Sequence, residues 1–179
     1  MSYHHLALAA KDMKAIHAFY EGVMGFELVK VEVAPIMEGG WGKHFFYRMD
    51  GDDSKFIAFW ELHGTAKQET LEFDLNKAAN MPQGTNHFSF DVHSREELDS
   101  WRTRWNEAGL DVLELDHNWC QSVYTRDPNG NLVEFCLTTG SFTEDDRERA
   151  LAALDETEMN PSPPPATMKH WPANKAETA

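Results

Sequence analysis

The sequence predicts an α+β fold built from two copies of one β-α-β-β-β unit. His5-Leu6-Ala7-Leu8 returns as His87-Phe88-Ser89-Phe90, and 87 minus 5 gives an offset of 82 residues. In both copies an alternating run precedes a helix-like stretch and a glycine-apolar pair, which indicates an internal duplication. We therefore expect two modules with a linker between them and a C-terminal helix and proline-rich tail. Their ranges are 1–64 for the first module, 65–83 for the linker, 84–139 for the second module and 140–179 for the helix and tail.

The first module begins with a strand over residues 4–10. Asp12 then caps a helix in which Met13, Ile16, Tyr20 and Val23 recur at helical spacing as far as Gly25. Turn-rich clusters separate the three strands that follow, which we expect over 26–33, 41–49 and 55–62.

The second module repeats this order from a strand over residues 86–92. The run Ser94-Arg95-Glu96-Glu97 predicts a capping box that opens a helix as far as about Ala108. Three strands follow, and Asp127-Pro128-Asn129-Gly130 joins the last two as a tight hairpin turn. Their expected ranges are 110–115, 120–126 and 131–137. Thr143 opens an acidic helix as far as about Thr157. The proline run that follows, over residues 161–165, is expected to be extended, and its mobility is left open.

Charge and cysteine content limit the partners and the compartment. The chain has 30 acidic and 16 basic residues, so its formal net charge of −14 disfavours nucleic acid and anionic membranes. Cys120 and Cys136 are too few for a disulfide framework, and we find no signal peptide and no membrane-spanning apolar run. We therefore expect a soluble cytoplasmic protein with reduced cysteines.

Strand alternation predicts a metal site. His87, Ser89 and Asp91 share one face of their strand, opposite the apolar residues that cover the helix, and the repeat gives His5 the same position beside Ala7 and Ala9. In the last strand Glu134 faces the same side as Cys136. A single histidine of this kind is more often structural, but two matched histidines and a carboxylate can share one divalent cation.

These residues resemble the vicinal oxygen chelate superfamily, which includes glyoxalase I, extradiol dioxygenases, methylmalonyl-CoA epimerase and fosfomycin or bleomycin resistance proteins. The resemblance covers residues 3–138, and the segment from Asp127 to Phe135 carries its most specific part. It implies paired modules that form a cupped mixed sheet around a divalent metal, with His5, His87 and Glu134 in the positions of the metal ligands. It does not cover the chain beyond Gly140.

The position of Glu61 is left open between two alignments. The isomerases and lyases of this superfamily usually place a fourth ligand on the last strand of the first module, which here contains Glu61. If Ala58 aligns with Glu134, Glu61 faces the helix side, whereas direct alignment of Glu61 with Glu134 makes it a ligand or a catalytic base.

Two further residues favour oxygen chemistry. Tyr124 precedes Glu134 by ten residues, a spacing similar to that of the active-site tyrosine of extradiol dioxygenases, and His117 lies where those enzymes carry an acid-base histidine. Either residue could instead have an ordinary packing or surface role. A site with only three protein ligands suits Fe(II), although Zn, Ni, Co and Mn are also compatible.

We interpret the chain as a metalloenzyme that cleaves a small vicinal diol of the catechol type with dioxygen at a non-heme Fe(II). A glyoxalase or epimerase reaction through a metal-stabilised enediolate is the alternative, and non-catalytic binding of a small molecule is a second one. The expected assembly is a homodimer. Four residues are candidate walls of the substrate pocket, namely His44, Arg48, Trp60 and Trp119.

Overall fold

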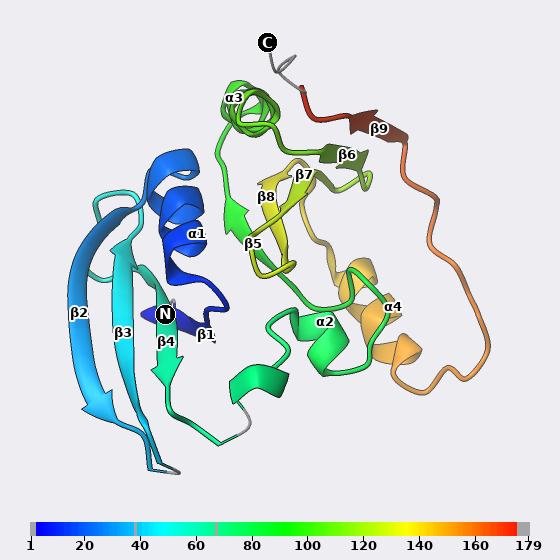
Figure 1. The fold of residues 1–179 in the computed structure, drawn as a ribbon. Coiled ribbons are helices and arrows are strands. Elements are labelled where there is room, and N and C mark those ends of the chain that lie inside the picture. Colours follow the sequence, from blue (N-terminus) through cyan, green and yellow to red (C-terminus); the bar gives the residue numbers. More distant parts are fainter. Residues whose placement is uncertain (1–2, 38, 67, 175–179) are drawn as a thin grey trace. The chain divides into compact units, whose positions relative to one another are not determined.

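The fold is α+β, with two mixed sheets and few helices, as the sequence predicts. The computed structural model describes residues 3–37, 39–66 and 68–174 (Figure 1). The predicted first module and tail also include residues 1–2 and 175–179, which lie outside the described residues. The order of the elements follows the predicted duplication, with one strand more at the C-terminal end.

The first sheet has the order β1-β4-β3-β2, and β1 runs parallel to β4 while the other pairs are antiparallel. Its strands are β1 (His5–Ala9), β2 (Glu27–Pro35), β3 (Trp41–Arg48) and β4 (Phe56–His63). The second sheet has the order β5-β8-β7-β6-β9. Its strands are β5 (His87–Asp91), β6 (Val112–Asp116), β7 (Cys120–Arg126), β8 (Leu132–Thr138) and β9 (Thr167–Trp171).

The first helix changes type along its length. Asp12 caps α1 (Met13–His17), because its carboxylate accepts the backbone N–H groups of Lys14 and Ala15 at 2.9 and 3.1 Å. The chain then widens into a π-helix, η1 (Ala18–Val23), where the sequence predicts a continuous α-helix. Apolar spacing does not reveal this change, because a π-helical segment of six residues is too short to show a period of its own.

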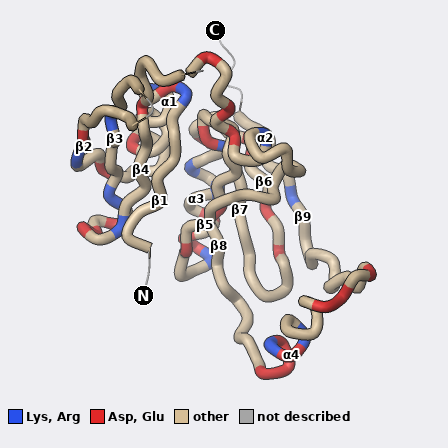
Figure 2. The backbone as a smooth tube through the Cα atoms, turned by 90° about the horizontal axis from the view of Figure 1, so that it is seen from below, with Lys and Arg blue, Asp and Glu red and all other residues tan. Residues whose placement is uncertain are grey.

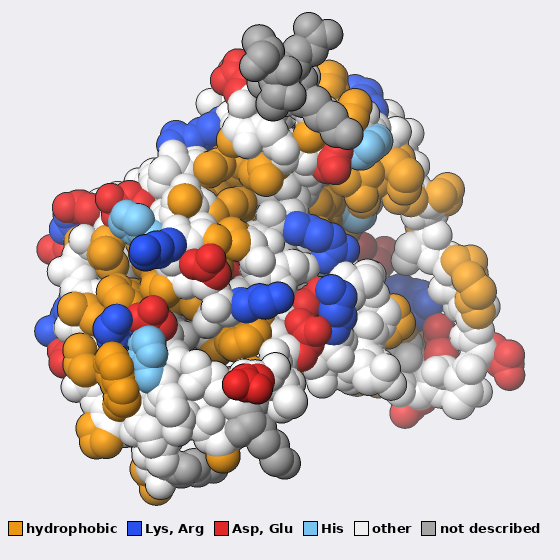
Figure 3. Space-filling view, viewed as in Figure 1, with side chains coloured by type: hydrophobic (Ala, Val, Ile, Leu, Met, Phe, Trp, Pro, Cys, Tyr) orange, Lys and Arg blue, Asp and Glu red, His pale blue; other side chains and the backbone are white. Residues whose placement is uncertain are grey.

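One face of the first sheet packs against this helix. Tyr20 lies at the centre of that core, with its ring centroid 4.6 Å from that of Phe59 and 6.4 Å from that of Tyr47. All three side chains are fully buried, as are Ile16 and Ile57. Apolar side chains also reach the surface over the first sheet (Figure 3), where Val31 and Val33 of β2 are exposed.

The segment between the modules is more ordered than a linker. It contains a 3-10 helix, η2 (Gln68–Thr70), and a short helix, α2 (Leu75–Ala78). Asp74 caps α2, because its Oδ1 accepts the N–H groups of Asn76 and Lys77 at 2.9 and 3.2 Å. Because the segment is polar and weakly patterned, the sequence did not indicate that Asp74 is an N-cap.

In the second module α3 (Arg95–Glu107) covers the apolar side of β8. Ser94 accepts the N–H of Glu97 at 3.1 Å, as the predicted capping box requires, but the Glu97 carboxylate accepts the N–H of His93. Trp101 stacks on Phe135 at 4.1 Å with the rings 16° apart, so odd-numbered residues of β8 face the helix as the alternation predicts.

The C-terminal segment forms a helix and an additional strand. Thr143 caps α4 (Glu144–Ala153), which is shorter than expected and has no buried residue, and whose first turn is acidic (Figure 2). Beyond the proline run, β9 pairs antiparallel with β6, with Trp171 opposite Val112. Local sequence could not indicate this pairing, because its partner strand lies about fifty residues earlier.

The described chain divides into two compact units that do not coincide with the repeats. Unit 1 contains residues 1–88 and 126–133, and unit 2 contains residues 89–125 and 134–179. The turn that joins β7 and β8 therefore packs with the first module. None of the helices among the described residues is long and apolar enough to cross a membrane.

Candidate functional site

The side of the first sheet opposite α1 carries His5, and we call it the His5 face. Strand register places Ala7 beside Ala58, and Ala58 beside Phe46. The ring of His5 contacts those of Phe46 and His44, with centroids 5.7 and 6.2 Å away. The small alanines leave the histidine ring accessible, and His5 is exposed.

His44 lies within an aromatic cluster on the His5 face. Its ring stacks on Trp60 at 4.1 Å with the planes 13° apart, and its centroid lies 4.2 Å from that of Phe46. Burial, and then the nearby His5, lower the pKa of His44, while Glu32 opposes this shift. Among the described residues its Nε2 has no hydrogen-bond partner. The structure thus places two predicted pocket residues, His44 and Trp60, beside a predicted ligand.

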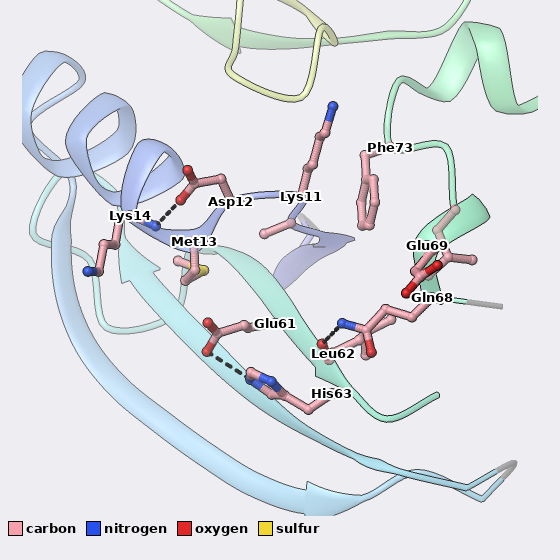
Figure 4. Close-up of a pocket in the computed structure, with 12 residues that line it drawn as sticks. Lys11, Asp12, Met13, Lys14, Glu61, Leu62, His63, Gln68, Glu69 and Phe73 are labelled. Atoms are coloured by element: carbon pink, nitrogen blue, oxygen red, sulfur yellow. Dashed lines mark hydrogen bonds and ion pairs between the residues drawn. The ribbon is translucent and has the colours of Figure 1, made fainter. Parts of the chain in front are cut away.

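Glu61 faces the opposite side of the sheet. Its Oε2 lies 2.8 Å from Lys43 Nζ. The same oxygen lies 3.3 Å from His63 Nε2 (Figure 4). The hydrogen bond from Lys43 lowers the pKa of Glu61, although partial burial acts against it. Because Ala58 occupies the His5 face, the first of the two alignments describes this chain, and Glu61 has no place in a metal site built on His5.

The Glu61 side chain borders a cavity of about 500 Å³ within unit 1 (Figure 4). Met13 and Phe73 supply apolar walls, and Lys11 and Glu69 supply charged ones. Gln68 donates from Nε2 to the Leu62 carbonyl at 2.8 Å, which fixes η2 along one side. The charges around this cavity are of both signs.

His87 begins β5, the hydrogen-bonded neighbour of the strand that carries Glu134. Its Nδ1 lies 3.1 Å from the Gly84 carbonyl oxygen, which can only accept a hydrogen bond. Nδ1 therefore carries the proton of the neutral ring, and the lone pair is on Nε2. This is the usual tautomer of a metal-binding histidine whose other nitrogen is held by the backbone.

Glu134, Tyr124 and His117 lie together in unit 2. The Tyr124 Oη is 2.9 Å from His117 Nε2, and the same hydroxyl group interacts with the carboxylate of Glu134. Burial raises the pKa of Tyr124, a contact with Ser122 lowers it, and Glu134 raises it further. The tyrosine is consequently a protonated donor at neutral pH. Three residues that the sequence analysis names as candidates are thus linked by hydrogen bonds.

The two remaining pocket candidates have other contacts. Arg48 pairs with Glu27 and with Asp53 near the surface. Trp119 is about half exposed and packs its ring against Phe142 at 5.5 Å. Neither arrangement gives these side chains a specific role toward His5 or Glu134.

The predicted ligands are shared between the two units. His5 and His87 belong to unit 1, and Glu134 belongs to unit 2. Within the described part of the chain, no three His, Cys, Asp or Glu side chains form a cluster suited to a metal. The donor types nevertheless fit a divalent cation, because two imidazoles and a buried carboxylate form a common ligand set. Glu134 is only 5% exposed and interacts with the Tyr124 hydroxyl, so its carboxylate is held in a polar setting inside the fold.

A group of buried asparagines was missed by the sequence reasoning. Asn76 and Asn131 are 0% and 1% exposed, although both lie in or next to turns. The pattern Asp-x-Asn in 74–76 and the run of Asx residues in 127–131 are the signal that could have identified them, because such side chains bond to nearby backbone.

The model of the Glyoxalase/Bleomycin resistance protein/Dioxygenase superfamily matches residues 2–135. Metallothiol transferase FosB of Shouchella clausii is 29% identical over 106 residues, which are 57% of this chain and 70% of that protein. A lactoylglutathione lyase structure from Agrobacterium tumefaciens is 28% identical with a TM-score of 0.51, covering 76% of this chain and 92% of that one.

FosX, a fosfomycin resistance protein from Listeria monocytogenes, has a similar fold. Its structure gives a TM-score of 0.53 at 19% identity, over 82% of this chain and 98% of that one. The repeated β-α-β-β-β order, the two sheets and the match over residues 2–135 agree with one another. The chain belongs to the Glyoxalase/Bleomycin resistance protein/Dioxygenase superfamily.

Proposed function

We propose that this protein is a metal-dependent enzyme in which His5, His87 and Glu134 hold one divalent ion. The tautomer of His87 and the burial of Glu134 support the assignment of these two ligands. His5 is supported by its position at the start of the first copy of the repeat and by the space that the alanines leave beside it.

The choice of iron and dioxygen chemistry rests on one observation, which is that the His5 face of β4 carries no carboxylate. Register places Phe56, Ala58 and Trp60 of β4 on that face, while Glu61 is paired with Lys43 on the other. The site therefore has three protein ligands, and the remaining positions accept a chelating substrate. A ferrous ion in such a site can bind both a vicinal diol and dioxygen.

Within this proposal Tyr124 is a hydrogen-bond donor to the substrate and His117 is the base that accepts a proton from it. The Tyr124 O–H, which the Glu134 carboxylate accepts in the structure, turns to donate to the substrate oxygen, and His117, 2.9 Å from the Tyr124 oxygen, takes up the proton that the substrate loses. Because burial keeps Tyr124 protonated, it can stabilise the negative charge that develops on the oxygen. The substrate is a small catechol-type diol, and the aromatic stack of His44 and Trp60 offers a flat apolar wall for its ring.

A second candidate is thiol transfer or a lyase reaction on a small oxygen-rich substrate. It is favoured by the identities of 29% and 28% to a metallothiol transferase and a lactoylglutathione lyase. It requires the same three ligands and differs in the metal and in the absence of oxygen consumption.

Metal analysis and oxygen uptake test the proposal. The protein is purified without added metal, reconstituted with Fe²⁺ under nitrogen, and given catechol in an oxygen electrode. We expect one iron per chain and uptake that depends on catechol. Bound Zn, Ni, Co or Mn without uptake would support the second candidate instead. If no divalent ion binds, the metal proposal is wrong, and small-molecule sequestration becomes the better reading.

A matched pair of histidine variants locates the site. We expect His87→Ala to abolish metal binding, and His93→Ala to retain it, because His93 is exposed and pairs only loosely with Asp91, at 3.7 Å. Equal binding by both variants would overturn the ligand assignment. Light scattering of the same samples tests the proposed homodimer.

A further inference from the structure

Four buried polar side chains of unit 1 connect the strands that carry the proposed ligands. We call them the asparagine clip, and they are Asn76, Asp127, Asn129 and Asn131. Each is less than one-tenth exposed. A tight hairpin turn requires none of this burial, because its backbone conformation depends on local dihedral angles alone. The contacts of the clip with distant segments therefore need a separate explanation.

The clip contacts the end of β1, the strand that begins with His5. Asn129 donates from Nδ2 to the carbonyl of Ala9 at 2.8 Å, and its Oδ1 accepts the N–H of Lys11 at 3.0 Å. One carboxamide thus holds both sides of the turn between β1 and α1.

The clip also forms the start of β8, the strand of Glu134. Asp127 Oδ1 accepts the N–H groups of Asn129 and Asn131, both at 2.9 Å. Its Oδ2 accepts from the Tyr20 hydroxyl at 3.1 Å and from Asn131 Nδ2 at 3.3 Å. Asn131 directly precedes β8 and lies three residues before Glu134, so Asp127 holds the residue from which this strand begins.

The third contact is at the start of β5, next to His87. Asn131 Oδ1 accepts the N–H of Leu75 at 2.9 Å, which joins the hairpin turn to α2. From α2, Asn76 donates from Nδ2 to the Asn86 carbonyl at 2.8 Å, and its Oδ1 accepts the N–H of Asn86 at 2.7 Å. Asn86 is thus held by two hydrogen bonds directly beside a proposed metal ligand.

We infer that the asparagine clip is a positioning device for the metal ligands, an inference that rests on the proposed function. It acts through the backbone, since none of its members is itself a proposed ligand. Residues that orient metal ligands typically change metal affinity about 10- to 100-fold when they are replaced. A purely architectural clip would instead change stability alone.

The test compares Asn76→Asp with Ser94→Ala. Asn76→Asp keeps the size of the side chain but places an oxygen against the Asn86 carbonyl. Ser94→Ala removes the N-cap of α3 in unit 2, so it destabilises the chain without touching the clip. Affinity for Mn²⁺ is measured by calorimetry, the Co²⁺ absorption spectrum reports ligand geometry, and urea unfolding reports stability.

For Asn76→Asp we expect an affinity at least about 10-fold weaker and an altered Co²⁺ spectrum. Ser94→Ala should unfold at lower urea but bind both ions as the wild type does. If Asn76→Asp loses stability while its affinity and spectrum stay unchanged, the inference is wrong and the proposed function stands. If the wild type binds neither ion, the proposed function fails, and the positioning role fails with it.

Discussion

Replacing Trp171 provides the sharpest test of the interactions that keep β9 paired with β6. Its indole N–H donates to the carboxylate of Glu114 at 3.0 Å, and its ring lies 4.4 Å from the guanidinium carbon of Arg102. The Glu114 side chain is 4% exposed and also accepts from Arg95 at 2.7 Å. Trp171 therefore connects β9 to a buried charge cluster.

Trp171→Phe removes the hydrogen bond and keeps the aromatic ring over Arg102. A hydrogen bond to a charged group contributes about 1.5–3 kcal/mol, and we take the lower end because Glu114 retains Arg95. Trp171→Ala also removes the cation–π contact and the apolar packing, which brings the loss to about 3 kcal/mol. Since each 1.4 kcal/mol is a factor of ten, the equilibrium constant for opening of β9 should rise about 10-fold in Trp171→Phe and about 100-fold in Trp171→Ala.

Hydrogen exchange of the β6 amides is the appropriate assay, because an edge strand can detach while the rest of the chain stays folded. Met168→Ala is the matched control on the same strand, since Met168 is 67% exposed. Exchange in β6 that is equally fast in the wild type and in Trp171→Phe would refute this account of the strand.

Three further outcomes follow from buried polar groups. Burial alone would raise the pKa of Glu114, but hydrogen bonds from Arg95 and Trp171 bring this pKa below the usual 4.5. The ionised Glu114 therefore stabilises the fold fully above pH 4.5, and this stabilisation is lost as the pH falls through the lowered pKa. The protection factors of the β6 amides, which correct for the pH dependence of intrinsic exchange, should therefore fall on acidification below pH 4.5, and less so in Glu114→Gln. His44→Phe should raise the unfolding free energy by about 1 kcal/mol, measured in urea, because it keeps the stack on Trp60 and removes an unsatisfied buried nitrogen; a lower value would contradict this. Tyr20→Phe should cost about 1.5 kcal/mol in the same assay, because Asp127 loses a hydrogen bond of 3.1 Å, and an unchanged midpoint would show that this bond is not stabilising.

Strand faces were predictable because alternation is a local property. The sequence alone indicated that His5 lies with Ala7 on one face and that Phe135 packs toward the helix, and the ring contacts of both residues agree. The face of Glu61 was not predictable, since shifting the alignment by one residue reverses every side chain. Only the pairing of Ala7 with Ala58 resolves it.

Contacts between distant segments could not be predicted from the sequence. β9 follows a proline-rich run and has no local feature that names β6 as its partner. The same holds for Asn131, whose turn was predicted but whose bond to Leu75 joins residues 56 positions apart. His117 and Tyr124 were each predicted as candidate site residues, but their contact was not, because a separation of seven residues along a bent hairpin does not define a distance.

The Asn129-Gly130 pair has a consequence for the chemical ageing of this protein. Asparagine before glycine is the dipeptide most prone to deamidation, because the unhindered glycine nitrogen can attack the side-chain carbonyl. Here both ends of the Asn129 carboxamide are bonded and the residue is 8% exposed, so the native fold shields it. Once deamidated, the new carboxylate would repel the Ala9 carbonyl. Stored samples should accordingly accumulate this lesion mainly through unfolded molecules.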